Sequence, residues 1–334
     1  MPKNTDHSNM RQILLDFPSQ FALGLEASAK VKVSGQFDNI IVCGMGGSAW
    51  PGELVNTYLI DLKIPLFVSR DYFLPKETTA KSLIFASSYS GDTEEMLSAY
   101  GEARKRNLTI VGFSKGGTLA KLCQEDGIPL AQYPDLGPSY QPRYATGLMF
   151  AAMVKVLSNS ELVAPKDAEI KATASFLGQL DNEALGKKLA KELKNKIPLI
   201  YSSEQYKTIP FIWKIKFNET AKVMAFSERF PEMNHNDMTG FTLNKKQGKF
   251  FAFFLRNKND HPRIQTRMNI TAQLLESEGV RVIFLDSQGD TRLEQIFSLI
   301  NLGDWITYYL ALKYGIDPTP TDLQAAFKKQ LSKI

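Results

Sequence analysis

Cysteine and histidine are scarce in this sequence. Its 334 residues include two cysteines, Cys43 and Cys123, and three histidines. Two cysteines cannot build a disulfide framework, and neither belongs to a Cys-x-x-Cys pair, so we expect a reducing compartment, the cytoplasm. So few ligands of this type also disfavour a His/Cys metal centre. We therefore expect no metal site.

The sequence also lacks a dominant charge and a long uninterrupted apolar run. Forty Lys and Arg residues stand against thirty-five Asp and Glu residues, a net charge of +5, and no basic block stands out. Nucleic acid and membrane surfaces are therefore poor candidates for the main partner, whereas an anionic small molecule is suitable. The N-terminus MPKNTDHSNM has no signal-peptide core. The most apolar stretch, 293–314, contains charged residues and predicts a buried helix rather than a membrane span.

Length and hydrophobic pattern together predict two α/β domains with parallel sheets. The chain exceeds about 250–300 residues, the size at which single cores stop growing. Short β-branched runs alternate with helical stretches, which is typical of parallel strands covered by helices on both faces. The expected strands are residues 39–44, 65–69, 82–87, 108–113, 128–133, 197–203, 222–227, 249–255 and 280–286. The expected helices are residues 51–60, 92–106, 117–125, 144–157, 206–217, 234–240, 263–277 and 290–314.

A polar stretch rich in Ala and Lys interrupts the strand pattern. Residues 158–196 contain no strand candidate and predict a helical connector. We therefore expect an N-terminal domain at 1–157, the connector at 158–196 and a C-terminal domain at 197–334.

The first expected strand ends in the glycine-rich loop Gly44-Met45-Gly46-Gly47-Ser48. Glycines let the backbone approach an oxyanion, and the N-terminus of a following helix offers free N–H groups. The loop lacks the G-x-G-x-x-G spacing of dinucleotide folds and the G-K-[ST] of a P-loop, which disfavours a Rossmann-type dehydrogenase. A tight strand–helix turn without a ligand remains the alternative.

The third expected strand ends in a loop rich in hydroxyl groups. Ser88, Ser90 and Thr93 gather around the start of a helix, where neutral donors and the helix dipole can hold a phosphate dianion. Ordinary capping needs only one or two such residues, and Asp92 with Glu95 already has the spacing of a capping box. Two such loops after parallel strands predict a phosphate site at the carboxyl edge of the sheet.

These two loops and four later motifs resemble the bifunctional phosphoglucose/phosphomannose isomerases of the SIS (sugar isomerase) domain superfamily. The later motifs are Gln141-Pro142-Arg143, Asn218-Glu219-x-Ala221-Lys222, Pro231-Glu232-Met233-Asn234-His235-Asn236 and Asp317-Pro318-x-Pro320. They follow one another through nearly the whole chain, and the PEMNHN string is the most specific. The resemblance implies two SIS-type, flavodoxin-like αβα sandwich domains. It also implies interconversion of glucose 6-phosphate, and mannose 6-phosphate, with fructose 6-phosphate through a cis-enediol, without metal or cofactor.

The resemblance further implies a role for individual residues. Glu219 would move the proton between C1 and C2, His235 would open the sugar ring and Arg143 would stabilise the enediolate. Lys328, with Lys329 as the alternative, would be the C-terminal lysine that reaches the active site. The phosphate ligands would be Gly46, Gly47, Ser48, Ser88, Ser90 and Thr93. The family also implies a homodimer, with the histidine contributed across the interface, and Thr321 bears on the balance between glucose and mannose.

Each of these residues also has a simpler interpretation. A single glutamate usually lies on the solvated surface, His235 could belong to a capping turn, and Arg143 could form a surface ion pair. The alternative function is a non-catalytic sensor of sugar phosphates, which would keep the serine loops and lose Glu219 or His235. An amidotransferase would need a cysteine nucleophile near the N-terminus, where this chain has none.

Overall fold

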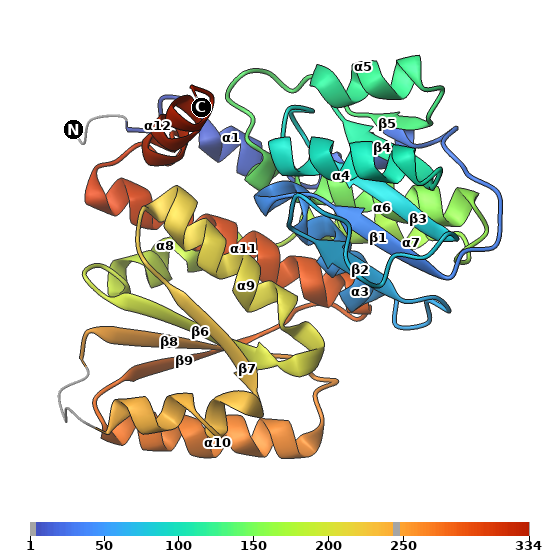
Figure 1. The fold of residues 1–334 in the computed structure, drawn as a ribbon. Helices are drawn as coiled ribbons and strands as arrows, with labels where there is room; N and C mark the ends of the chain where they lie inside the picture. The colour runs from blue at the N-terminus through green and yellow to red at the C-terminus, as the bar shows by residue number, and fades with distance from the viewer. Residues whose placement is uncertain (1–4, 243–247, 334) are drawn as a thin grey trace. The chain divides into compact units, whose positions relative to one another are not determined.

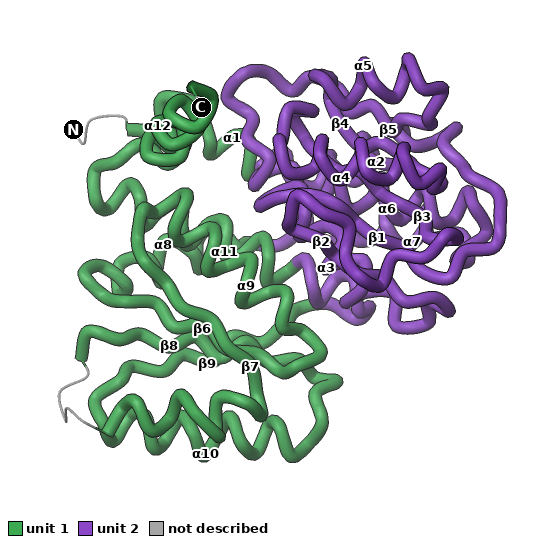
Figure 2. Tube along the Cα trace, in the orientation of Figure 1, with its two compact units in different colours: residues 1–14, 181–288, 298–334 green, residues 15–180, 289–297 purple. Residues whose placement is uncertain are grey.

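The computed structural model describes residues 5–242 and 248–333, which form α/β layers around two parallel sheets (Figure 1). The chain divides into two compact units (Figure 2). Unit 1 draws on residues 1–14, 181–288 and 298–334, and unit 2 on 15–180 and 289–297. Each unit thus combines separated stretches of the sequence. The expected domain limits, 1–157, 158–196 and 197–334, stay a prediction.

The sheet of unit 2 has five parallel strands in the order β2-β1-β3-β4-β5. The strands are β1 (Asn39–Cys43), β2 (Leu66–Ser69), β3 (Ser82–Ser87), β4 (Thr109–Ser114) and β5 (Leu130–Gln132). Side chains on one face, such as Ile41 and Ile84, pack on α4 (Glu94–Lys105) and α5 (Gly117–Glu125). The other face meets α3 (Trp50–Tyr58), where the absence of a side chain at Gly52 allows contact with Val42. The remaining helices of unit 2 are α2 (Ser19–Ala27), α6 (Thr146–Asn159) and α7 (Asp167–Leu177).

The sheet of unit 1 has four parallel strands in the order β7-β6-β8-β9. The strands are β6 (Ile197–Ser203), β7 (Phe226–Phe230), β8 (Phe250–Arg256) and β9 (Arg281–Asp286). One face packs on α10 (Pro262–Ser277), and the other is covered by α9 (Thr208–Lys216), whose Trp213 ring lies edge-on to Phe253. The remaining helices of this unit are α8 (Asn182–Glu192) and α12 (Asp322–Leu331). Helix α11 (Arg292–Tyr314) begins in unit 2 and continues in unit 1, and α1 (Met10–Leu15) runs from unit 1 into unit 2.

The predicted fold class is confirmed, because both sheets are parallel and are covered by helices on both faces. Residues 158–196 contain α7 and α8 and no strand, as the sequence pattern predicted. The stretch 293–314 is a largely buried helix, and none of the described helices is long and apolar enough to cross a membrane. The pattern gave no hint of α1 and α2.

Two expected elements were wrong. The strand expected at 222–227 is β7 at Phe226–Phe230, because the helical bonding of α9 continues through a π-helix at Phe217–Ala221. The helix expected at 234–240 is instead a pair of short 3₁₀ turns, Glu232–Asn234 and Asp237–Phe241. Both errors fall beside motifs of the candidate site.

Glu183 anchors the N-terminal helix α1 within unit 1. Arg11 donates from Nε and Nη2 to the two carboxylate oxygens of Glu183, each at 2.8 Å, and the Tyr309 hydroxyl donates to the same group. The hydrogen bonds from Arg11 lower the pKa of the Glu183 carboxyl, against the opposing effect of burial. A bidentate arginine–carboxylate pair combines strength with fixed geometry, so it sets the position of α1.

We expect Glu183→Gln to lower the melting temperature near pH 7, with a difference from wild type that shrinks as the solution is acidified. A carboxyl whose pKa is lowered by folding contributes stability that is fully present above its unfolded pKa, about 4.3, and is lost as the pH falls through the folded pKa. Thermal unfolding at pH 7 and pH 3 measures the difference. Glu276→Gln on the surface of α10 is the control. A gap of equal size at both pH values would contradict the assignment.

Candidate functional site

The two predicted phosphate loops follow adjacent parallel strands of unit 2, β1 and β3. The first loop forms a 3₁₀ turn at Gly46–Ser48 that leads into α3. Two hydrogen bonds join the loops: Ser48 Oγ accepts the N–H of Tyr89 at 3.0 Å, and Ser87 Oγ donates to the carbonyl oxygen of Ser48 at 2.8 Å. The sheet therefore brings together the residues that the sequence placed at one edge.

Hydroxyl groups meet at the start of α4. The hydroxyls of Ser88 and Thr93 hydrogen-bond at 2.8 Å, and Ser88 Oγ also accepts the N–H of Gly91. Ser88 is buried, Thr93 is half-buried and Ser90 is exposed. Thr93 occupies the N-cap position of α4 without making a capping side-chain hydrogen bond. The Thr93 side chain therefore accepts no hydrogen bond from the first N–H groups of this twelve-residue helix. An anion that binds at a helix N-terminus needs such N–H groups to donate to it.

The expected capping box of Asp92 and Glu95 is wrong. Asp92 Oδ1 accepts both the N–H and the hydroxyl of Thr118, at 2.9 and 2.8 Å. It therefore serves the first turn of α5 rather than that of α4. The reason is Gly117, whose left-handed backbone brings the two loops so close that a Cβ there would lie 2.9 Å from the Asp92 carboxylate.

Arg143 packs against the first phosphate loop. Arg143 belongs to the 3₁₀ turn Pro142–Tyr144, which packs tightly on Gly47. A Cβ on this glycine would lie 2.8 Å from the backbone nitrogen of Arg143. The side chain is only 3% exposed, and the guanidinium lies 4.5 Å from the centre of the Tyr144 ring. The alternative of a surface ion pair is thereby excluded. Unit 2 brings Gly47, Ser48 and Arg143 together.

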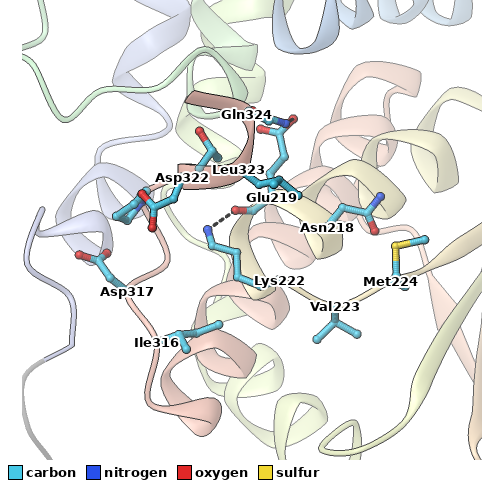
Figure 3. Close-up of a pocket in the computed structure, with 12 residues that line it drawn as sticks. Asn218, Glu219, Lys222, Val223, Met224, Ile316, Asp317, Asp322, Leu323 and Gln324 are labelled. Carbon is cyan, nitrogen blue, oxygen red and sulfur yellow. Dashed lines mark hydrogen bonds between the residues drawn. The ribbon is translucent and has the colours of Figure 1, made fainter. Parts of the chain in front are cut away.

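Glu219 lies in the π-helix that extends α9 (Figure 3). Such wide turns are rare and are frequently found at functional sites. Here the N–H of Val223 reaches back to the carbonyl of Phe217 at 3.1 Å, and Asn218 Oδ1 accepts the N–H of Ala225. Glu219 as a residue is half-buried, and its Oε1 accepts a solvent-exposed hydrogen bond of 3.4 Å from Gln324 Nε2.

A cavity of about 620 Å³ opens beside Glu219 within unit 1. Three segments form it: the end of the π-helix, the chain after α11 and the first turn of α12. Its size suits a small organic ligand, and it combines apolar walls with a few polar groups, as binding sites commonly do. Its lining residues are Asn218, Glu219, Lys222, Val223, Met224, Ile316, Asp317, Pro320, Thr321, Asp322, Leu323 and Gln324. Sequence patterns indicated Glu219 and Thr321 but gave no signal for Gln324.

His235 and Lys328 do not line this cavity. His235 is exposed and follows the 3₁₀ turn Glu232–Asn234. Its ring has no hydrogen-bond partner in the described part of the chain, whereas the neighbouring Asn234 and Asn236 are held by Thr271 and Glu232 at 2.8 and 2.9 Å. The polar stretch thus fixes the backbone on both sides of the imidazole and leaves the imidazole itself in solvent.

Helix α12 distinguishes between the two candidate lysines. Lys328 and Lys329 are both exposed. Lys328 follows Gln324 by four residues and so shares its helix face. Lys329 is turned away from Gln324 by about 140°. The face that bears Gln324 is the one beside Glu219, which favours Lys328.

No group of three or more His, Cys, Asp or Glu side chains within residues 5–242 and 248–333 is arranged to hold a metal ion.

Comparison with known proteins defines the class of fold first. Residues 182–331 match the family described as the bacterial phospho-glucose isomerase C-terminal SIS domain. Over 93% of its length the chain is similar in fold to the C-terminal domain of glucosamine-fructose-6-phosphate aminotransferase from Francisella tularensis, with a TM-score of 0.70 at 15% identity and 98% of that chain covered.

Sequence identity to named relatives identifies the family more closely than the fold does. The chain is 36% identical to the bifunctional phosphoglucose/phosphomannose isomerase of Caldicellulosiruptor bescii, over 94% of this chain and 95% of the relative. It is 33% identical to the protein of the same name from Aquifex aeolicus, over 89% and 91%. The chain therefore belongs to the family of bifunctional phosphoglucose/phosphomannose isomerases, which confirms the resemblance found in its motifs.

We expect Gly47→Ala to weaken binding of inorganic phosphate and to destabilise the protein by about 1–3 kcal/mol, because the added methyl group would overpack against the turn that carries Arg143. Calorimetric titration and thermal unfolding measure the two effects. Gly101→Ala inside α4 is the matched control, since its Cβ would meet nothing within 4 Å. The control should keep phosphate affinity and gain stability of at most about 1 kcal/mol. Unchanged affinity and stability in Gly47→Ala would contradict the close approach.

Proposed function

We propose that this protein is an aldose–ketose isomerase that interconverts glucose 6-phosphate, and mannose 6-phosphate, with fructose 6-phosphate. The observation that carries the proposal is the Glu219 carboxylate on the wall of a ligand-sized cavity. This residue stands in the Asn218-Glu219 motif that resembles the family's base. The family name of the relatives gives the substrates.

We propose that the hydroxyl groups of unit 2 bind the phosphate. Ser48, Ser88 and Thr93 would donate to its oxygens, together with Ser90 and the backbone of Gly46 and Gly47. Neutral donors and the start of α4 can hold a dianion without a cluster of lysines, which fits the small net charge of +5.

Glu219 is proposed as the general base. Its carboxylate would remove the proton from C2 of the open-chain aldose and return it to C1, while the C1 carbonyl oxygen gains a proton and the C2 hydroxyl loses one. The negative charge of the enediolate would be stabilised by the Arg143 guanidinium, whose burial strengthens its electrostatic effect. Glucose 6-phosphate and mannose 6-phosphate differ only at C2, so both lead to the same enediol.

The roles of the remaining residues follow the family pattern. His235 would assist ring opening, Lys328 would act from α12, and Thr321 on the cavity wall would influence the choice between the two aldoses. We propose a homodimer in which His235 acts in the site of the neighbouring subunit, which accords with an imidazole that the described chain leaves in solvent. The two free thiols, Cys43 and Cys123, accord with a reducing cytoplasm. A non-catalytic sensor would have no need of both Glu219 and His235.

We expect Glu219→Gln to lower kcat by about 100- to 10,000-fold, because an amide cannot accept the proton. Conversion of fructose 6-phosphate in the presence of EDTA, with both aldose products counted, measures the activity. Glu125→Gln at the end of α5 is the control and should keep full activity. Absence of turnover in the wild type would refute the function, and retained kcat in Glu219→Gln would show that another residue is the base. Activity restored only by zinc would exclude the metal-free route.

We expect two inactive variants, Glu219→Gln and His235→Ala, to complement each other when refolded or co-expressed together. In a mixed dimer the intact Glu219 of one subunit and the intact His235 of the other form one complete site, so about a quarter of wild-type activity should return. Each variant alone is the control. A fully active monomer in sedimentation, or a mixture no more active than its components, would contradict the shared site.

A further inference from the structure

Lys222 has an unusual backbone conformation at the end of the π-helix. Its φ of 57° and ψ of 35° place it in the left-handed region, which residues other than glycine and asparagine seldom adopt. Among the described non-glycine residues with positive φ, three of the other four are asparagines. A lysine at this position lacks the local tolerance of asparagine, so its side chain must provide the reason for its presence.

The ammonium group of Lys222 bridges two backbone carbonyl groups. Nζ donates to the carbonyl oxygen of Glu219, drawn as the dashed line in Figure 3, and to that of Pro318 at 3.3 Å. The first carbonyl belongs to the proposed base. The second belongs to the segment between α11 and α12. One side chain therefore ties the wide turn to the chain that leads into α12.

Together with a contact from α12, these hydrogen bonds hold Glu219 at two points. The segment at Pro318 leads into α12, and Gln324 of α12 donates to Glu219 Oε1 at 3.4 Å. Glu219 is thus held at its backbone by Lys222 and at its carboxylate by a helix whose approach Lys222 also holds. An ammonium group that donates to carbonyl oxygens forms charge-assisted hydrogen bonds, which are stronger than neutral ones.

We infer that Lys222 is a positioning residue for the isomerisation, which orients Glu219 without taking part in proton transfer. The inference rests on the proposed role of Glu219 as the base. Loss of the ammonium group would release both the wide turn and the start of α12, and the carboxylate would lose its fixed geometry. A displacement of about 1 Å at a reacting group can cost about 100-fold in rate. The effect should fall on kcat.

Three substitutions at Lys222 separate positioning from stability. Lys222→Met keeps an unbranched side chain, shorter by the terminal nitrogen, and the strained backbone and removes the donor, so kcat should fall by about 10- to 100-fold with little change in KM. Lys222→Arg keeps a cationic donor and should restore most of the activity. Lys222→Gly loses the same donor but relieves the left-handed backbone, so its melting temperature should lie above that of Lys222→Met while kcat falls as in Lys222→Met. Lys313→Met, at an exposed position near the end of α11, is the control.

The measurements are kcat and KM for fructose 6-phosphate and thermal unfolding of the same preparations. Wild-type kcat retained in Lys222→Met would overturn the inference and leave the proposed function intact, because wild-type turnover is measured in parallel. A rise in KM alone would overturn it too, since the ammonium group would then bind the substrate. A loss of activity that follows melting temperature across all three variants would assign Lys222 a structural role only. Absence of turnover in the wild type would instead refute the isomerase function itself.

Discussion

The buried ion pair of Lys216 and Asp304 is the interaction on which the candidate base depends. Lys216 is completely buried and Asp304 is 1% exposed. Loss of either partner would leave an uncompensated charge in the core, which is strongly destabilising. Lys216 is the last residue of α9, and Asp304 lies in α11, so the pair fixes the end of one helix against the other. The π-helix that carries Glu219 begins at the next residue.

The same helix contact is reinforced by a glycine and a tryptophan. A Cβ at Gly303 would lie 2.5 Å from Trp213 Nε1, so only glycine admits the indole there. Trp213 then donates to the carbonyl oxygen of Leu299 at 2.9 Å. Polar and apolar contacts thus set one registry between α9 and α11. The wide turn starts from a position that the core determines, whereas its own shape depends on the polar groups of Asn218 and Lys222.

Most strands of the two sheets could be predicted from the sequence, because each of these strands is a short apolar run of consecutive residues. Runs such as 39–44 and 82–87 are apolar throughout, and the structure buries every residue of β1 and β3. The hydroxyl loops could be placed at one edge because parallel strands end on the same side of a sheet. The segment 222–227 was misinterpreted for a physical reason: KVMAFS has the composition of a strand, but hydrogen bonds back to the wide turn hold its first residues outside the sheet, and Met224 is 66% exposed.

The contacts around Glu219 were beyond local patterns. Gln324 is 105 residues from Glu219 and Pro318 is 96 residues from Lys222, so no periodicity could pair them. The Asn218-Glu219 motif predicted that Glu219 is a functional residue, but it did not predict the π-helix in which Glu219 lies. The same limit applies to unit 1, which joins residues 1–14 to residues that follow 181 through the pairing of Arg11 with Glu183.

Stability and precision rest on different parts of unit 1. Its sheet is held by many buried aromatic and aliphatic side chains, so the loss of one contact changes the architecture little. Helix α12 has no buried residue, and Leu323 is 85% exposed. Its place beside Glu219 therefore depends on a few polar contacts, each with a net contribution of about 0.5–1.5 kcal/mol. A difference of 1.4 kcal/mol is about tenfold in an equilibrium constant, so one such contact can decide how often the cavity is correctly assembled. Because Lys222 holds the backbone carbonyl of Glu219 and Gln324 holds its carboxylate, their contributions to the geometry of this residue should be coupled rather than additive.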